Sequence, residues 1–253
     1  MEGLSLPKYK LSVGALFKNE SHSIKEWIEH YLIRGVDHFY LIDDSSTDNY
    51  LMEIQEYIDK GIISLFIANW DRYLGRQKDM YNHYILPKLK ETEWLLMVDL
   101  DEYMWSPRDL KLTFVLNQAK HIGQMQVEHT IYGSNGYIEQ PKKIVESFIR
   151  RSHEHPTQVP GNRKYFVNSL FEFSSLNPHH ATFVSKEDEE KHFILLDKTY
   201  YILNHYNCQS KEFWLNVKCK RGDSDEYRER TEEDFKAVDL NDIEDTELIK
   251  QNS

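Results

Sequence analysis

The sequence has few of the features that mark secreted, membrane-spanning or metal-stapled proteins. Its only two cysteines, Cys208 and Cys219, are too few for a disulfide framework and lack the CxxC spacing of a zinc site. No run of about 18 apolar residues occurs, so we expect no membrane span. The first residues, MEGLSLPKYKL, lack the apolar core of a signal peptide. These absences favour a cytoplasmic protein, because a reducing compartment is the default for such a chain.

Positive charge is also scarce. The chain has 31 Lys and Arg against 42 Asp and Glu, a net charge of −11, which argues against a nucleic-acid partner. Residues 222–253 alone carry 12 acids and 4 bases. We therefore divide the chain into a domain of residues 1–222 and an acidic C-terminal tail of residues 223–253. The charge density of the tail favours a frayed, solvated end that the chemistry does not need.

What is present is a globular composition, with 40% apolar and 13% aromatic residues. In the first half, apolar runs typical of strands alternate with segments that have helical periodicity. The expected strands are residues 10–17, 36–42, 62–68 and 94–98, and the expected helices are residues 21–34, 50–60 and 77–90. This alternation predicts an α/β fold with a parallel sheet that has helices on both faces.

The second half is more mixed. Residues 123–129, 145–151, 164–173 and 199–203 are expected to be strands, and residues 111–120 and 210–220 helices, the last capped by Ser210.

Polar residues follow each of the first four expected strands. They are Lys18, Asn19 and Glu20 after the first, Asp43 and Asp44 after the second, Asn69–Asp71 after the third, and Asp99–Asp101 after the fourth. In parallel sheets, ligands bind beyond the carboxyl ends of the strands. We therefore expect these side chains to share one site.

Asp99 and Asp101 form a D-x-D motif at the end of a buried strand. Two carboxylates there suit a hard divalent cation, Mn²⁺ or Mg²⁺, which would neutralise a diphosphate leaving group. His205, far along the chain, has the neutral imidazole that would suit Mn²⁺ as a third ligand.

A cationic stretch near residue 218 stands out in this acidic chain. Helical spacing places Lys211, Lys218 and Arg221 on one face. Fixed cations of this kind suit a diphosphate, and a solvated helix face is the alternative.

Taken in order, these motifs resemble glycosyltransferase family 92 and its family-2-like GT-A relatives. The resemblance runs from about Lys10 to Gly222. It is carried by Lys18-Asn19-Glu20, Glu26-Trp27-Ile28, residues 35–48, Trp94 with residues 98–103, residues 132–136, Asn204-His205-Tyr206, residues 211–213, Lys218 and Arg221-Gly222.

The resemblance implies a GT-A (Rossmann-like) fold, which has a mixed central sheet with helices on both faces. It also implies a nucleotide-sugar donor, a divalent metal and inversion at the anomeric carbon, with a glycan, a glycoprotein or another hydroxyl compound as acceptor. By position, it places Phe17, Asn19, Glu20, Asp44, Asp71 and Gln77 at the donor nucleotide, Asp99 at the ribose or metal, Asp101 and His205 at the metal, and Lys211, Lys218 and Arg221 at the diphosphate. A uridine nucleotide is expected, with guanosine as the alternative.

An inverting transferase also needs a general base. The sequence offers Glu172 and Glu128, both on expected strands. Two other functions stay open. A nucleotidyltransferase would want a glycine-rich loop after the first strand, and residues 17–21 contain no glycine. A nucleotide-sugar- or carbohydrate-binding module with a degenerate site is the other, although Asp99, Asp101 and His205 are intact.

Overall fold

The computed structural model describes residues 6–153, 163–222, 224 and 230–252, and its centre is a mixed sheet. The strand order is β3-β2-β1-β4-β8-β6-β12-β5, with β11 also paired to β6. Strands β1–β4 are mutually parallel, whereas β8 runs antiparallel to both β4 and β6. The strands are β1 Tyr9–Phe17, β2 His38–Asp43, β3 Ile63–Ile67, β4 Thr92–Met97, β5 Glu102–Trp105, β6 Gln124–Ile131, β8 Arg163–Asn168, β11 Phe193–Leu196 and β12 Ile202–His205.

Two small two-stranded sheets lie outside it, β9 Phe173–Leu176 with β10 Ala181–Phe183, and β7 Arg150–Arg151 with β13 Ile243–Glu244. The helices are α1 Ile24–Ile33, α2 Tyr50–Asp59, α3 Arg76–Met80, η1 Tyr81–Ile85, η2 Leu86–Glu91, α4 Thr113–Gln118, α5 Ile144–Ser147, α6 Lys186–His192, α7 Lys211–Phe213, η3 Trp214–Lys218, α8 Cys219–Arg221, α9 Glu232–Val238 and α10 Glu247–Asn252. Among the described residues, we find no helix with the length and apolar character that crossing a bilayer requires.

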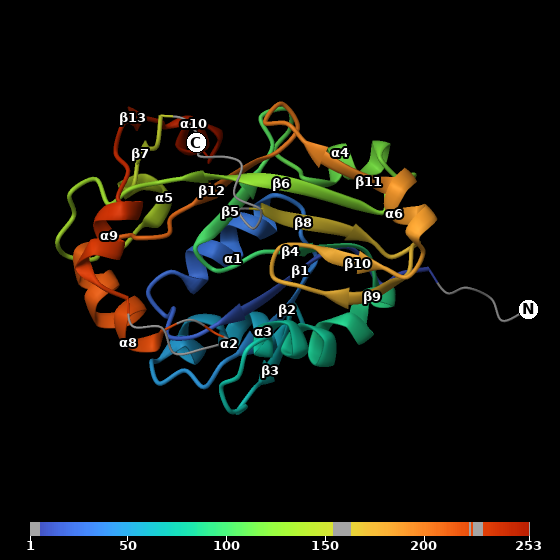
Figure 1. The fold of residues 1–253 in the computed structure, drawn as a ribbon, viewed down its shortest axis with the longest axis horizontal. Helices are drawn as coiled ribbons and strands as arrows, with labels where there is room; N and C mark the ends of the chain where they lie inside the picture. Colours follow the sequence, from blue (N-terminus) through green and yellow to red (C-terminus); the bar gives the residue numbers. More distant parts are fainter. Residues whose placement is uncertain (1–5, 154–162, 223, 225–229, 253) are drawn as a thin grey trace, which may run out of the picture.

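Helices cover both faces of the sheet, as the sequence predicts (Figure 1). On one face, Trp27 of α1 and Ile54 of α2 pack against Val13 of β1 in the larger apolar core. On the other, Met80 and Ile85 of the α3–η1 segment pack in a second core with the β9–β10 hairpin. The first-half strands and helices lie within a few residues of their expected positions, and the α/β class is confirmed.

The expected strand at residues 145–151 is wrong. Its first part is the short helix α5, and only Arg150 and Arg151 are extended. The cause lies far away in sequence, since the Glu26 carboxylate accepts hydrogen bonds from the backbone N–H groups of Ile144 (2.8 Å) and Val145 (3.1 Å). A carboxylate on these N–H groups stabilises the start of a helix, and β-branched residues nearby do not reveal it.

The expectation of a frayed acidic tail is also wrong for the part that the structure describes. Thr231 and Asp234 form a capping box at the start of α9, and Phe235 packs on Trp214. Further along, β13 pairs with β7, and Leu248 is 2% exposed in the main core. Several of the described acids are exposed, while a few spaced apolar side chains are buried. Net charge therefore gives no sign of this packing.

Gly133 lies where the described part of the acidic C-terminal segment, residues 223–253, packs closely against the rest of the chain. A Cβ at Gly133 would lie 2.5 Å from the Leu240 carbonyl oxygen and 2.4 Å from Asn241 Oδ1. The Asp239 carboxylate also accepts from the Ser134 backbone N–H at 2.6 Å.

We predict that Leu248→Ala lowers the free energy of unfolding by about 2–4 kcal/mol, because it removes a buried side chain and leaves a cavity. The same change at Leu170, which is 71% exposed, is the matched control and should cost less than about 0.5 kcal/mol. Urea denaturation of both variants measures this. Equal stabilities would mean that the acidic segment does not pack in solution.

Candidate active site

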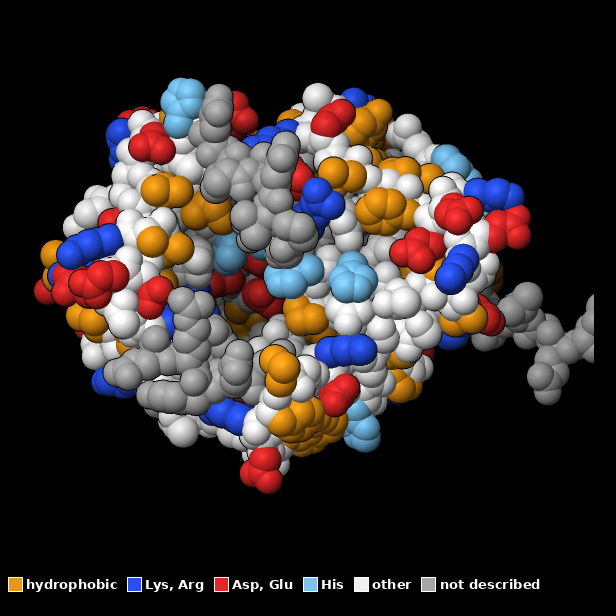
Figure 2. Space-filling view, in the orientation of Figure 1, with side chains coloured by type: hydrophobic (Ala, Val, Ile, Leu, Met, Phe, Trp, Pro, Cys, Tyr) orange, Lys and Arg blue, Asp and Glu red, His pale blue; other side chains and the backbone are white. Residues whose placement is uncertain are grey.

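A cavity of about 600 Å³ opens at the carboxyl ends of β1, β2 and β4. Its lining includes Phe17, Lys18, Glu20, Asp44, Gln77, Asp99, Asp101, His179, His205, Lys218 and Arg221. Figure 2 shows it as a hollow in the surface, with acidic side chains in its floor and histidines beside it. The parallel strand ends thus converge on one site, as the sequence predicts.

Side chains of helix α1 hold the D-x-D turn in place by hydrogen bonds to the backbone carbonyls of the turn. The Trp27 indole N–H donates to the carbonyls of Asp99 (3.1 Å) and Glu102 (3.0 Å). The Tyr31 hydroxyl donates to the Glu102 carbonyl at 3.0 Å and accepts from the Met104 N–H at 2.9 Å. These bonds satisfy buried carbonyls, and they hold the turn so that the carboxylates at its tip can face the cavity.

A buried lysine from β8 holds the first carboxylate of the turn. Lys164 Nζ lies 2.7 Å from Asp99 Oδ2 and 3.6 Å from Glu102 Oε2, and its side chain is 1% exposed. Burial alone would lower the pKa of Lys164, but the two carboxylates outweigh it and raise that pKa. Burial raises the pKa of Asp99, with Lys164 acting in the opposite sense. Lys164 therefore stays charged as the permanent counter-ion of this pair.

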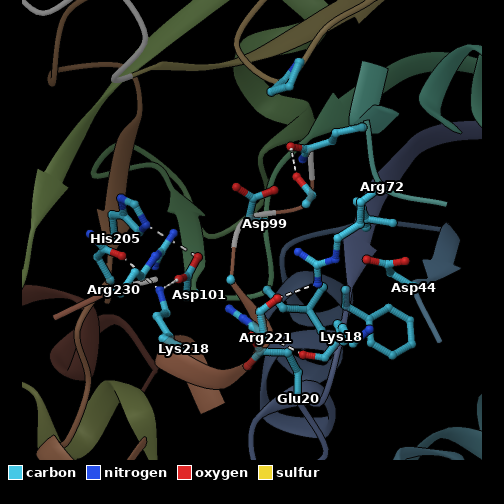
Figure 3. Close-up of a pocket in the computed structure, with 18 of the residues that line it drawn as sticks. Lys18, Glu20, Asp44, Arg72, Asp99, Asp101, His205, Lys218, Arg221 and Arg230 are labelled. Carbon is cyan, nitrogen blue, oxygen red and sulfur yellow. Dashed lines mark hydrogen bonds and ion pairs between the residues drawn. The ribbon is translucent and has the colours of Figure 1, made fainter. Parts of the chain in front are cut away.

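A second buried lysine holds Asp101. Lys218 Nζ lies 2.6 Å from Asp101 Oδ2 and also donates to Asn207 Oδ1 at 2.9 Å. The other oxygen, Oδ1, lies 3.5 Å from His205 Nε2. Burial acts to raise the pKa of Asp101, but Lys218 and His205 outweigh it and hold that pKa well below its usual range. Figure 3 shows these three side chains gathered on one side of the cavity.

Two further ion pairs lie on the opposite side, and Glu20, Asp44 and Arg221 of these pairs line the cavity. Arg221 pairs with Glu20 and donates to the Lys18 carbonyl at 2.7 Å. Arg76 pairs with the buried Asp44, with Nη1 3.1 Å from Oδ2. Figure 3 shows Asp44 across the cavity from Asp101, with Asp99 between the two sides. The volume of about 600 Å³ lies within the range of small-ligand sites in proteins.

Two sets of side chains could hold a metal ion. The donor atoms of Asp99, Asp101 and Glu102 lie within 4.8 Å of one another, and so do those of Glu102, His129 and His205. The expected set, Asp99, Asp101 and His205, is divided between these two groups, and Asp101 Oδ1 lies 3.5 Å from His205 Nε2. Carboxylate and imidazole donors suit Mn²⁺.

The structure brings most of the expected donor residues together. Phe17, Glu20, Asp44, Gln77, Asp99, Lys218 and Arg221 all line the cavity, as do Asp101 and His205. Asn19, Asp71 and Lys211 do not. Asn19 Oδ1 accepts from the Thr47 N–H at 2.7 Å and so joins two loops. Lys211 pairs with Glu232 of α9 at 2.8 Å, and Asp71 is exposed.

Neither glutamate expected as general base lines the cavity. Glu172 follows β8, whose last residue, Asn168, pairs with Trp94 near the start of β4, so it lies at the far end of the sheet from Asp99. Glu128 forms an ion pair with Arg163 at 3.1 Å. On β6 it alternates with His129 and so faces away from Glu102. Only their position on expected strands pointed to these two glutamates. That position does not determine which end of the sheet, or which face of it, a side chain occupies.

Sequence reasoning missed Glu102, His129 and Lys164. Glu102 directly follows the D-x-D motif, and His129 lies in an expected strand, so both could have been singled out. His129 Nε2 lies 2.8 Å from Glu102 Oε1, and burial lowers the pKa of His129 to about 4. Nothing local points to Lys164, because only the antiparallel pairing of β8 with β4 brings it to Asp99.

Comparison with known proteins identifies the family. Residues 8–248 match glycosyltransferase family 92, and this range includes most of the acidic segment. The chain belongs to glycosyltransferase family 92. A family 92 protein of Oryza sativa subsp. japonica is 23% identical over 210 residues, 79% of this chain and 34% of that protein. One of Ricinus communis is 29% identical over 231 residues, 84% of this chain and 37% of that protein.

This family 92 chain thus spans about a third of the length of these curated relatives. Among solved structures, it is similar to Staphylococcus aureus TarS in complex with UDP-GlcNAc (16% identity, TM-score 0.43, 96% of this chain and 70% of that one). It is also similar to the Pyrobaculum calidifontis mannosyltransferase PcManGT in complex with GDP-Man and Mn²⁺ (13% identity, TM-score 0.43, 78% and 57%). The family and the mixed sheet with helices on both faces together give the GT-A fold class that the sequence predicts.

We predict that Lys164→Met destabilises the protein by about 3–5 kcal/mol at pH 7, because it leaves the fully buried Glu102, and Asp99 beside it, without their cation. Lys120→Met is the matched control, since Lys120 is 60% exposed and pairs with Glu93 at 3.3 Å, and it should cost less than about 1 kcal/mol. Chemical denaturation at several pH values measures both.

The loss of unfolding free energy caused by Lys164→Met should also become smaller as the pH falls below about 4. Lys164 helps to hold the pKa of Glu102 below its usual value, so the stability that this pair contributes is present above the unfolded pKa and is lost in acid. A loss that stays constant with pH would argue against the ion pair as its cause.

Proposed function

We propose that the chain transfers a sugar from a nucleoside-diphosphate sugar to a hydroxyl acceptor, with inversion at the anomeric carbon. The observation that carries the proposal is that Asp99, Asp101 and His205 line the same cavity as the cations Lys218 and Arg221. A nucleoside diphosphate needs both features, because its phosphates require fixed positive charge while its ribose hydroxyls are good donors to carboxylates.

We assign the metal role to Asp99, Asp101 and His205. A divalent cation, Mn²⁺ or Mg²⁺, would supply Lewis-acid stabilisation of the departing diphosphate there. Lys218 and Arg221 bind and orient the phosphates and are themselves held in place by Asp101 and Glu20. Because these cations are already fixed before the donor arrives, little side-chain entropy is lost on binding.

In the proposed reaction, the acceptor oxygen forms a bond to the anomeric carbon while the bond from that carbon to the phosphate oxygen breaks. The acceptor proton must pass to a base. We propose His179 for this role, because it lines the cavity where Glu128 and Glu172 do not. Its Nδ1 lies 3.1 Å from the Arg163 carbonyl, to which it donates, so the neutral ring has its lone pair on Nε2. Burial lowers the pKa of His179, which favours this neutral form.

We place the acceptor, a glycan, a glycoprotein or another hydroxyl compound, in the adjoining cavity of about 440 Å³. His179 and Asp99 line both cavities, so an acceptor there would meet the donor at their junction. Ala237 and Val238 of α9, with Leu240 two residues after that helix, form one wall. We also propose that the protein acts in the cytoplasm.

Two alternative functions make different predictions. A binding module with a degenerate site would hold the donor without releasing nucleoside diphosphate. A nucleotidyltransferase would release pyrophosphate from a nucleoside triphosphate and a sugar phosphate. Measuring nucleoside diphosphate release from a panel of UDP- and GDP-sugars with Mn²⁺ present therefore tests the proposal directly, and the absence of release from every donor would overturn it.

We predict that UDP binds more tightly than GDP in calorimetric titrations with Mn²⁺. Phe17 can cover a pyrimidine face, a contact worth about 1–3 kcal/mol, and the Asp44 carboxylate can accept from the ring N–H. Asp44→Asn, which keeps the side-chain shape, should weaken UDP binding about tenfold, as expected for one lost charge-assisted hydrogen bond. Asp71→Asn, the same change at an exposed residue outside the cavity lining, should not weaken it. Tighter binding of GDP than of UDP, or an unchanged UDP affinity in Asp44→Asn, would contradict the uridine assignment but not the proposed transferase activity.

We predict that His179→Gln lowers kcat about 10²–10⁴-fold while donor affinity stays within about twofold, because a base acts on the acceptor and not on the nucleotide. His180→Gln is the matched control, since the neighbouring His180 is exposed. The low-pH limb of kcat in the unmodified protein should lie below the ordinary histidine pKa and be absent in His179→Gln. If both variants have the same kcat, His179 is not the base.

A further inference from the structure

Three neighbouring strands bring two histidines and a glutamate together behind the D-x-D turn. Glu102 of β5 lies directly opposite His205 of β12 in the antiparallel ladder. His129 of β6 pairs with Leu203, two residues before His205, so its side chain lies on the same face as that of His205. All three side chains line the cavity of about 440 Å³.

Their donor atoms lie close together, and Glu102 and His129 form an ion pair. His129 Nε2 lies 2.8 Å from Glu102 Oε1, and His205 Nε2 lies 4.0 Å from the same oxygen. Glu102 is 0% exposed and His129 is 3% exposed. Even so, Glu102 Oε1 and both ring nitrogens of His129 make no hydrogen bond of acceptable geometry within the part of the chain that the structure describes.

The lack of hydrogen bonds at Glu102 Oε1 and at the His129 ring sets the cluster apart from the neighbouring acids. Asp99 Oδ2 and Asp101 Oδ2 each have a lysine ammonium within 2.7 Å. Glu102 Oε2 likewise accepts from the Asp99 backbone N–H at 2.8 Å. Only its other oxygen turns toward the two imidazoles. A buried polar atom without a partner is costly, so groups of this kind generally have a ligand that completes them.

We propose that Glu102, His129 and His205 bind one first-row transition-metal ion in the absence of nucleotide. Two imidazoles and one carboxylate suit Mn²⁺, Co²⁺ or Zn²⁺, whereas Mg²⁺ prefers an all-oxygen shell. His205 belongs to both this set and the set assigned above to the donor-bound cation. Its Nε2 has one lone pair, so this nitrogen can bind only one ion at a time, and the nucleotide-free protein should bind a single ion.

The test uses the full chain, stripped of metal and free of nucleotide. Calorimetric titration should show one Co²⁺ or Zn²⁺ per chain and Mg²⁺ binding at least about 100-fold weaker, with cobalt absorption bands typical of nitrogen ligation. His129→Gln should weaken Co²⁺ binding at least about 100-fold, because it removes a direct ligand. His121→Gln, the same change at an exposed histidine outside both cavities, should bind as the unmodified protein does.

Two results would overturn the proposal: no Co²⁺ or Zn²⁺ binding by the nucleotide-free protein, or equal affinities for His129→Gln and the unmodified chain. If His129→Gln does not fold, the cobalt complex of the unmodified chain decides the matter. Paramagnetically shifted imidazole N–H resonances from two histidines support the site, and resonances from one or none contradict it.

The outcome is separate from that of the proposed transferase activity. Nucleoside diphosphate release and UDP titration report on the donor site, and both can fail while Co²⁺ still binds to the nucleotide-free chain. Conversely, a transferase that releases nucleoside diphosphate but binds no ion without nucleotide would contradict this site alone.

Discussion

The negative charge of the carboxylates that follow β4 must be balanced by nearby cations, and the rest of the site depends on this constraint. Asp99, Asp101 and Glu102 lie within four residues, and Glu102 is fully buried. Buried carboxylates of this density are tolerated only when cations and hydrogen bonds replace the lost water. Lys164 and Lys218 supply that charge from opposite directions, one from the sheet and one from a helix. The antiparallel insertion of β8 beside β4 is therefore an electrostatic requirement as well as a feature of the sheet.

The same constraint couples the acidic segment to the active site. Lys218 lies in the helical run that begins at Lys211, and α9 braces that run through the Trp214–Phe235 contact and the Lys211–Glu232 ion pair. Residues of the segment also form a wall of the second cavity. A segment that looks like a solvated tail in composition thus helps to position a cation on which Asp101 depends.

Local patterns in the sequence were sufficient for the first half of the fold and for lining residues at three of its four strand ends, although Asn19 and Asp71 do not line the cavity. The helix with Trp27 and Ile28, the strand ahead of Asp99 and the cap at Ser210 follow from periodicity and capping chemistry, which act over a few residues. What depends on distant pairing could not be read in this way. Lys164 reaches Asp99 only through the β4–β8 register, and α5 begins where it does because Glu26 caps it. Glu128 and Glu172 failed as lining residues for the same reason, since strand direction decides which edge they reach.

The charge balance of the site explains how an acidic protein can present a place for an anion. Each cavity-lining acid has a basic partner: Glu20 has Arg221, Asp44 has Arg76, Asp99 has Lys164 and Asp101 has Lys218. Lys18, Arg72 and Arg230 line the same cavity in addition. The net charge of −11 is therefore carried elsewhere, much of it in residues 222–253. At physiological ionic strength, exposed charges are screened over about 8 Å, so an approaching diphosphate responds mainly to the cations of the cavity. A negative net charge argues against a polyanionic partner that must cover a broad surface, but it does not bear on a small anion that enters one lined cavity.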